Sequence, residues 1–214
     1  MLDVDQDFKR IHGVKEGLKQ YYDLEKTTDP FSFNSGRVMA KIGVNTRTEE
    51  PEKMGCSFII IDNKPHLTKK GIIYLSKWVK TLFLVTTNDN HPAILLQNKL
   101  DNIVIISYQN QIDFSNLFIR MKGEYGAKKV TIQSGGTLNA QLLKENLIDE
   151  VSIVVAPCLI GGEETPSLVD GPSHTTEEDL LKIHPLKLIE NKTLENSYLH
   201  LRYLVLNNQA IDKQ

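Results

Sequence analysis

The sequence predicts an α/β fold with a mostly parallel central sheet, helices on both faces and an antiparallel C-terminal edge. Short aliphatic and β-branched runs alternate with segments of helical periodicity between residues 37 and 156. Repeated strand–helix–strand order joins the strands in parallel and places helices on both faces of the sheet. The last two expected strands have no convincing helix between them, so they can pair antiparallel at one edge.

We expect a single domain over residues 1–214, because this length supports one sizeable hydrophobic core and no linker interrupts it. Residues 1–36 are expected to be a helical extension. Its apolar residues recur at helical spacing: Phe8, Ile11, Leu18 and Tyr22. Thr27–Pro30 then indicates a break, and Asn34–Gly36 indicates a turn.

The following residues supply the sheet and its helices. The expected strands are short and rich in apolar residues: Arg37–Val44, Ser57–Asp62, Thr81–Thr87, Asn102–Ser107, Lys129–Gln133 and Val151–Ala156. The expected helices carry apolar residues on one face: Leu67–Lys80, Asp113–Tyr125 and Thr137–Glu145. Asn146 suits the left-handed position that ends the last of these helices. A final strand, Tyr198–Leu206, alternates in its first half.

The charge balance and the hydropathy argue against several classes of function. The chain has 25 Lys and Arg residues against 27 Asp and Glu residues, whereas nucleic-acid binders usually carry a basic excess. No apolar run reaches the ~18 residues of a membrane span. The first ten residues carry three aspartates and no apolar core, which argues against a secretory signal. We therefore expect neither nucleic-acid nor membrane partners.

The cysteines and histidines give no sign of a metal site or a disulfide. Cys56 and Cys158 lie far apart and form no CxxC pair, so we expect reduced, buried thiols in a cytoplasmic protein. The six histidines show neither an HExxH motif nor zinc-ligand spacing with a cysteine. We expect no bound metal.

The most informative segment is Val130–Gly162, in which a buried strand runs through Ser134 into Gly135-Gly136 and a helix follows at once. Two glycines let the backbone approach a ligand closely. The helix N-terminus adds free N–H groups and a partial positive charge, which suit a phosphate or diphosphate. A tight turn with a capped helix and no ligand explains the same residues equally well, so the sequence leaves both interpretations open.

Four motifs follow in order in this segment: Gly135-Gly136, Leu147-Ile148-Asp149-Glu150, Ala156-Pro157 and Gly161-Gly162. This series resembles the C-terminal part of the riboflavin-biosynthesis pyrimidine reductases. A weaker resemblance runs from about Arg37 to Asn88 and through the last strand, which leaves the first 30 or so residues outside it.

The resemblance implies a dihydrofolate-reductase-like fold, a homodimer, and NADPH as cofactor. It implies a ribosylamino-pyrimidine 5′-phosphate as the substrate, whose ribosyl group is reduced to a ribityl group. In the family the Gly-Gly turn and the helix start hold the cofactor diphosphate. The corresponding residues here are Ser134, Gly135, Gly136, Thr137 and Leu138. Thr86 and Thr87 would lie near the adenosine end of the cofactor and bond a 2′-phosphate, or they form only a strand-end turn.

The sequence departs from the family pattern at its first strand, where the family carries a Lys and then Ser-Leu-Asp-Gly. Laid against this pattern, Lys41 is kept and Asn45-Thr46-Arg47-Thr48 replaces the rest. Ser134 stands where much of the family has Glu. Lys41 is then the expected catalytic residue, relaying a proton, or is a surface lysine at a strand edge. Asn45 is expected to bind substrate, or is an ordinary turn residue.

Three hypotheses about function follow. The first is an NADPH-dependent reductase of the riboflavin pathway that acts on the ribosylamino-pyrimidine phosphate. The second is a reductase of the same fold that acts on another heterocyclic or carbonyl substrate, because the residues around Asn45 and Ser134 are changed. The third is a non-catalytic nucleotide-binding paralogue, because the same family carboxylates are lost.

Overall fold

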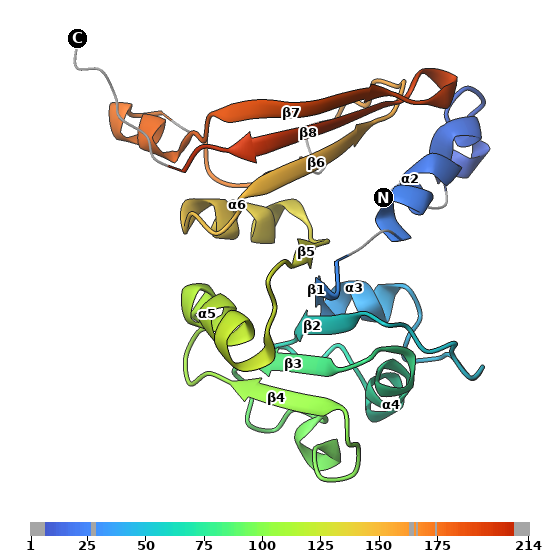
Figure 1. Ribbon diagram of the computed structural model, residues 1–214, viewed down its shortest axis with the longest axis vertical. Helices are drawn as coiled ribbons and strands as arrows, with labels where there is room; N and C mark the ends of the chain where they lie inside the picture. The colour runs from blue at the N-terminus through green and yellow to red at the C-terminus, as the bar shows by residue number, and fades with distance from the viewer. Residues whose placement is uncertain (1–6, 27–28, 163–164, 166, 174, 208–214) are drawn as a thin grey trace. The chain divides into compact units, whose positions relative to one another are not determined.

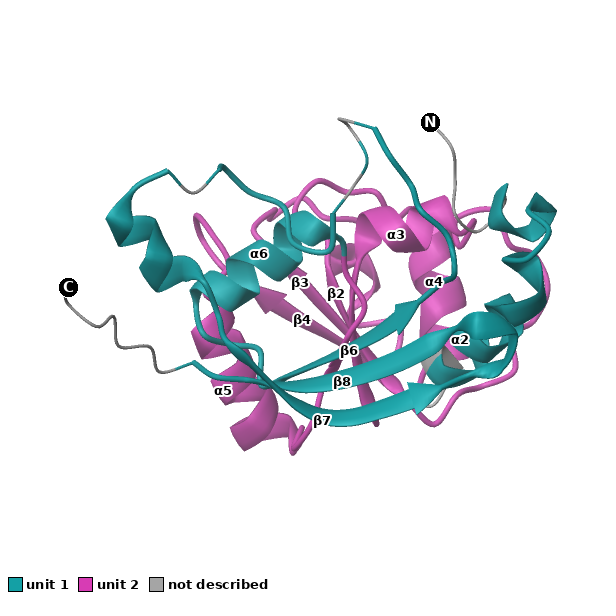
Figure 2. Cartoon of the chain, turned by 90° about the horizontal axis from the view of Figure 1, so that it is seen from above, with its two compact units in different colours: residues 1–27, 135–214 teal, residues 28–134 magenta. Residues whose placement is uncertain are grey.

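The computed structural model describes residues 7–26, 29–162, 165, 167–173 and 175–207. It divides into two compact units, shown in different colours in Figure 2. Unit 1 comprises residues 1–27 and 135–214, and unit 2 comprises residues 28–134. The expectation of a single domain stays a prediction. Within the described residues, no helix combines the length and the hydropathy that a membrane span requires.

Unit 2 contains a five-stranded parallel sheet with the strand order β4-β3-β2-β1-β5 (Figure 1). The strands are short: β1 (Phe31–Ser35), β2 (Ser57–Ile61), β3 (Leu82–Thr86), β4 (Ile103–Ser107) and β5 (Thr131–Ile132). Three α-helices accompany them: α3 (Gly36–Lys41), α4 (Lys69–Trp78) and α5 (Phe114–Tyr125). A 3₁₀ turn, η3 (Ile94–Leu96), follows β3. This confirms the predicted mostly parallel sheet.

The sheet of unit 2 is covered on both faces because its central strands are apolar at nearly every position. All five residues of β3 are buried. Alternate residues of β2 and β3 join α4 in one core cluster, which includes Ile60, Leu84 and Leu75. The residues in between meet α5, and Phe83 packs edge-on against Tyr125 at a centroid distance of 4.7 Å.

Side-chain caps fix the helix starts in unit 2. The Oγ atom of Ser35 accepts from the backbone N–H of Val38 at the start of α3, at 3.3 Å. Thr68 and Asp113 cap α4 and α5 in the same way. Such caps satisfy backbone donors that a helix start leaves unpaired, so they fix where each strand-to-helix connection begins.

In its described residues, unit 1 contains a three-stranded antiparallel sheet and two α-helices. The sheet order is β6-β8-β7, with β6 (Glu150–Val155), β7 (Leu186–Thr193) and β8 (Leu199–Val205). The helices are α2 (Leu18–Lys26) and α6 (Gly136–Lys144). Short 3₁₀ elements complete the unit: η1 (Phe8–Arg10), η2 (Lys15–Gly17), η4 (Glu177–Lys182) and η5 (Glu195–Ser197). The predicted antiparallel C-terminal pairing is confirmed by β6 and β8.

Within unit 1, the N-terminal segment contacts Tyr198, the residue just before β8. The hydroxyl of Tyr198 donates to the backbone oxygen of Val14 at 2.7 Å, and its ring lies where a side chain on Gly17 would be. The predicted helix is present as α2, but it begins only at Leu18. Gly13 has a positive φ of 87° and separates two 3₁₀ turns from each other before the helix.

Several predicted elements are wrong. Arg37–Val44 is not a strand: its first residues lie in α3, because Ser35 caps a helix there. Asn34–Gly36 is not a turn but the end of β1 and the first residue of α3. Cys56 is buried as expected, whereas Cys158 is only half-buried. Asn146 has the expected left-handed conformation, with a φ of 56°.

Candidate functional site

The C-terminal ends of the parallel strands in unit 2 bring several polar residues to one edge of the sheet. Asp62 directly follows β2, and Thr86 ends β3. Ser35 ends β1, where α3 begins. This edge is where open parallel α/β sheets bind their ligands, so these residues define the candidate site of unit 2.

Asp62 is the centre of this edge. Its side chain has no exposed surface and accepts hydrogen bonds from two backbone N–H groups, those of His66 and Leu67, each at about 3.0 Å. Two imidazoles complete the set: Nδ1 of His66 lies at 2.9 Å and Nε2 of His91 at 3.0 Å. Burial by itself raises the pKa of Asp62, but these hydrogen bonds outweigh burial and hold the pKa below its ordinary value.

The hydrogen bonds around Asp62 determine the proton positions on both imidazoles. Nδ1 of His91 accepts from the backbone N–H of Ala93 at 3.1 Å, so the ring proton of His91 is on Nε2 and faces Asp62. His66 donates to the same carboxylate from Nδ1. His91 is fully buried, whereas the side chain of His66 is 39% exposed.

Thr86 is fully buried, and its hydroxyl is used within the protein. The hydroxyl donates to the backbone oxygen of Asp62 at 3.0 Å and accepts from the backbone N–H of Asn88 at 3.1 Å. The backbone N–H of Thr87 donates to Oδ1 of Asn63. This is the strand-end turn that the sequence left open, and cofactor binding by Thr86 and Thr87 stays a prediction.

The Gly-Gly turn opens α6 in unit 1, as the sequence predicts. Gly135 is the N-cap, with φ −83° and ψ 168°, and no side chain caps the helix. A Cβ atom on Gly135 would meet no atom of the described residues within 4 Å, so this stretch of backbone is open to a ligand. Leu138 donates its backbone N–H to the oxygen of Gly135, and Ser134 is half-buried at the end of unit 2.

Gly136 faces a carboxylate that sequence reasoning missed. A Cβ atom on Gly136 would lie 2.5 Å from Cγ of Asp170, and the backbone N–H of Asp170 donates to the oxygen of Gly136. The hydroxyl of Thr137 donates to Oδ2 of Asp170 at 3.4 Å. The absence of a side chain at Gly136 is therefore required by Asp170 itself.

Asn45 and Arg47 both have partners within unit 2. The amide of Asn45 donates to the oxygen of His66 at 2.8 Å and accepts from the backbone N–H of Thr68 at 2.9 Å. The Cζ atom of Arg47 lies 5.5 Å from the ring centroid of Tyr74 and 5.6 Å from that of Trp78. Asn45 thus ties its loop to the start of α4, and substrate binding by Asn45 stays a prediction.

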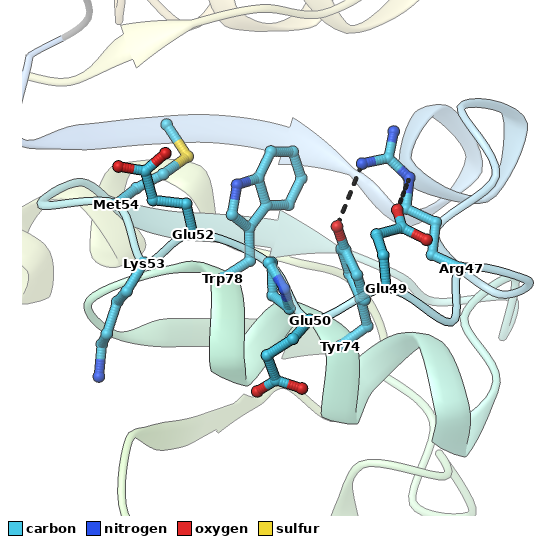
Figure 3. Close-up of a pocket in the computed structure, with 9 residues that line it drawn as sticks. Arg47, Glu49, Glu50, Glu52, Lys53, Met54, Tyr74 and Trp78 are labelled. Carbon is cyan, nitrogen blue, oxygen red and sulfur yellow. Dashed lines mark hydrogen bonds and ion pairs between the residues drawn. The ribbon is translucent and has the colours of Figure 1, made fainter.

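Arg47 borders an open pocket of about 550 Å³, shown in Figure 3. The pocket is lined by charged and aromatic or apolar side chains: Arg47, Glu49, Glu50, Pro51, Glu52, Lys53, Met54, Tyr74 and Trp78. Its aromatic surface is already covered in part by the guanidinium of Arg47, which donates to the Tyr74 hydroxyl at 3.2 Å. Arg47 is therefore a packing residue in this structure.

Lys41 does not lie on a strand. It is the exposed last residue of α3, the helix that leads away from the C-terminal end of β1. Its catalytic role stays a prediction. Among the described residues, no group of three His, Cys, Asp or Glu side chains is placed to hold a metal ion.

The family was identified by comparison with known proteins. The family model described as the RibD C-terminal domain matches residues 34–198. The chain belongs to this family. The match leaves out α2, most of β1 and all of β8, so it ends before the last strand, to which the resemblance in the sequence extends.

Several relatives carry the name 2,5-diamino-6-ribosylamino-4(3H)-pyrimidinone 5′-phosphate reductase. The protein of Archaeoglobus fulgidus is 33% identical over 117 residues, which is 54% of this chain and 51% of the relative. The protein of Methanothermobacter thermautotrophicus is 30% identical over 80 residues, 37% of each chain. The chain therefore matches about half or less of the length of these curated relatives.

Solved structures confirm the dihydrofolate-reductase-like fold. Acinetobacter baumannii RibD has a TM-score of 0.64 and 16% identity, covering 89% of this chain and 51% of that one. The riboflavin biosynthesis reductase Rib7 of Saccharomyces cerevisiae has a TM-score of 0.56 and 18% identity, covering 91% of this chain and 82% of that one. As a member of the RibD C-terminal domain family, the chain shares its fold with reductases.

Proposed function

We propose that this protein is an NADPH-dependent pyrimidine reductase that acts in the cytoplasm as a homodimer. Its substrate is a ribosylamino-pyrimidine 5′-phosphate, as the names of its relatives indicate. The observation that carries the proposal is the open backbone of Gly135 at the start of α6, in a chain of this family. When bound, the cofactor supplies the hydride.

The residues around Gly135 fit a dinucleotide diphosphate. A nine-residue helix begins there without a side-chain cap, so its first N–H groups point to the position that an anion would take. The backbone of Gly135 and the N–H groups of Gly136 and Thr137 would hold the diphosphate. Asp170 brings a negative charge to the same helix start, and this charge opposes binding of the anion.

Titration with NADPH, with NADH as the control, is the first test of this proposal. Binding of NADPH at micromolar concentration and weaker binding of NADH are expected. Substrate-dependent loss of NADPH absorbance would then establish the reaction. If neither nucleotide binds, the Gly-Gly turn is only a turn and the non-catalytic alternative replaces this proposal.

Replacing Gly135 by serine is expected to weaken NADPH binding at least ~10-fold without lowering the thermal midpoint of unfolding. The φ and ψ angles of Gly135 are open to any residue, and a Cβ atom there would lie more than 4 Å from every described atom outside its neighbours, so the fold tolerates serine. Serine is also a preferred N-cap, which stabilises α6. Titration of the variant by fluorescence, beside a melting curve, checks both parts. Unchanged affinity would show that the cofactor does not approach Gly135.

Replacing Asp170 by asparagine is expected to strengthen NADPH binding by roughly 3- to 10-fold, because it removes a negative charge beside the expected diphosphate. Asparagine keeps the shape of the side chain that fills the space above Gly136. Asp149→Asn is the matched control, since it makes the same charge change at an exposed position just before β6. Equal affinities of both variants and the wild type would contradict an electrostatic role for Asp170.

A second candidate function is a reductase of the same fold that acts on another heterocyclic or carbonyl substrate. The observation that favours it concerns Asn45, the residue expected to bind the pyrimidine substrate. Its amide oxygen and nitrogen both form hydrogen bonds within the protein, to the start of α4 and the loop before it. A panel of carbonyl and heterocyclic compounds assayed with NADPH separates the two candidates. Turnover of the ribosylamino-pyrimidine phosphate alone would exclude the second one.

A further inference from the structure

The proposed reduction needs a proton donor, and the C-terminal edge of unit 2 holds a side chain arranged to be one. His66 lies in the connection between β2 and α4, at the edge of the sheet where ligands bind in parallel α/β folds. Its ring is 39% exposed, whereas the carboxylate that binds Nδ1 is completely buried. A buried carboxylate that fixes a partly exposed imidazole is an arrangement suited to proton transfer.

The hydrogen bonds around Asp62 allow only one tautomer of neutral His66, the one with the proton on Nδ1. The carboxylate accepts from the backbone N–H groups of His66 and Leu67, from Nε2 of His91 and from Nδ1 of His66. The tautomer of His91 is fixed by Ala93, so His91 is a donor to Asp62 and needs no further proton. His66 therefore keeps its Nδ1 proton toward Asp62, and Nε2 is the nitrogen left for chemistry.

Among the described residues, the groups in contact with Asp62 and His66 include no second carboxylate. Gly36 of α3 packs directly on the carboxylate of Asp62 and carries no side chain. The amide of Asn45, which is neutral, binds the backbone oxygen of His66. The connection also carries Lys64, and α4 begins with Lys69 and Lys70; all three lysines are exposed and basic. Within the described residues, Nε2 of His66 makes no hydrogen bond in this setting.

We propose that His66 is the proton donor of the reaction and that Asp62 and His91 are positioning residues for it. This inference rests on the proposed function. When the ring-opened ribosylamine is reduced, a hydride adds to C1′ of a C=N bond, and the π electron pair moves to the nitrogen. Protonated His66 gives that nitrogen the proton on Nε2 and becomes a neutral imidazole that still donates from Nδ1 to Asp62. Water then restores the proton on Nε2.

The test is His66→Asn in the full chain. The asparagine amide N–H takes the position of Nδ1 and can still donate to Asp62, while Nε2 is removed. NADPH affinity is expected to stay within about twofold of the wild type, and kcat for the ribosylamino-pyrimidine phosphate to fall by roughly 100-fold. His12→Asn is the matched control, because the side chain of His12 is exposed and lies in unit 1.

The pH profile separates a proton donor from a residue that merely supports the fold. A proton donor must carry its proton to act, so kcat of the wild type is expected to fall toward alkaline pH. In His66→Asn this fall is expected to be absent. Long-range ¹⁵N NMR of the wild type is expected to show the Nδ1–H tautomer for His66 and the Nε2–H tautomer for His91 when both are neutral.

The outcomes distinguish this inference from the proposed function. If the wild type oxidises NADPH with the substrate but His66→Asn keeps its kcat and its pH profile, His66 is not the proton donor. If the wild type binds NADPH and shows no turnover, the proposed function fails and the role of His66 fails with it. An Nε2–H tautomer at His66 would overturn the positioning role of Asp62 independently of activity.

Discussion

Replacing Asp62 by asparagine is expected to lower the free energy of unfolding by about 3–5 kcal/mol, the cost of breaking a buried charged cluster. The carboxylate accepts four hydrogen bonds in a place without solvent. The amide nitrogen of asparagine would face one of these donors, and His91 cannot change its tautomer without losing the bond from Ala93. Urea denaturation followed by far-UV circular dichroism measures the change.

Asp113→Asn is the control for this prediction, because Asp113 caps α5 at an exposed position and asparagine is an equally good cap. Its free energy of unfolding is expected to stay within about 0.5 kcal/mol of the wild type. An Asp62→Asn variant as stable as this control would contradict the description of Asp62 as a buried, fully bonded carboxylate.

The effect of Asp62 is also expected to depend on pH. Its pKa is lower in the folded protein than the ordinary value of about 3.9 in an unfolded chain, because the hydrogen bonds outweigh burial. The charged form therefore stabilises the fold above about pH 4, and this contribution is lost as the pH falls through the folded-state pKa. The stability difference between the wild type and Asp62→Asn should shrink below about pH 4.

Replacing Gly36 by alanine is expected to destabilise the protein by about 3 kcal/mol, although alanine is ordinarily the better helix residue. The new Cβ atom would lie 2.3 Å from Cγ of Asp62, and that carboxylate is held in place by its four donors. The variant therefore has to move either α3 or the hydrogen-bonded cluster. The midpoint and slope of a urea transition measure the cost.

The same substitution in α5 gives the opposite sign and serves as the control. Gly123 lies inside the helix, and a Cβ atom there would meet nothing within 4 Å. Gly123→Ala is expected to stabilise the protein by about 0.5–1 kcal/mol. If both variants changed the stability in the same direction, the contact between Gly36 and Asp62 would not explain the result for Gly36.

The run of apolar residues in the sequence was sufficient to predict the central strands β2 and β3, but it did not predict the neighbouring strand β1. β2 and β3 are apolar at nearly every position, so their burial on both faces could be predicted from sequence. β1 contains buried polar residues: Ser32 binds Gln133 beside β5, and Asn34 binds Ser32. Gln133 lies about a hundred residues from Ser32, so the sequence around β1 did not indicate that this short polar segment is a buried strand.

The Gly-Gly helix start was predictable, and its acidic neighbour was not. The turn was visible because a strand, two glycines and a helix follow one another directly. Asp170 reaches Gly136 from more than thirty residues away, and its identity alone gives no indication of that contact.

The Asp62 cluster could be predicted only in part: an aspartate follows a buried strand directly, and a histidine follows four residues later. His91 joins them only because β3, which precedes it in the chain, pairs with β2.

The fluorescence of Trp78 allows the unfolding of unit 2 to be followed separately from that of unit 1. It is the single tryptophan of the chain, it lies at the end of α4 in unit 2, and it packs against Phe58 and Tyr74. Its emission therefore reports on the packing of unit 2, whereas far-UV circular dichroism reports on both units. Coincident transitions by the two signals mean that the chain unfolds as one cooperative body. Separate transitions mean that each unit carries a stability of its own, which ligands and substitutions can then change one at a time.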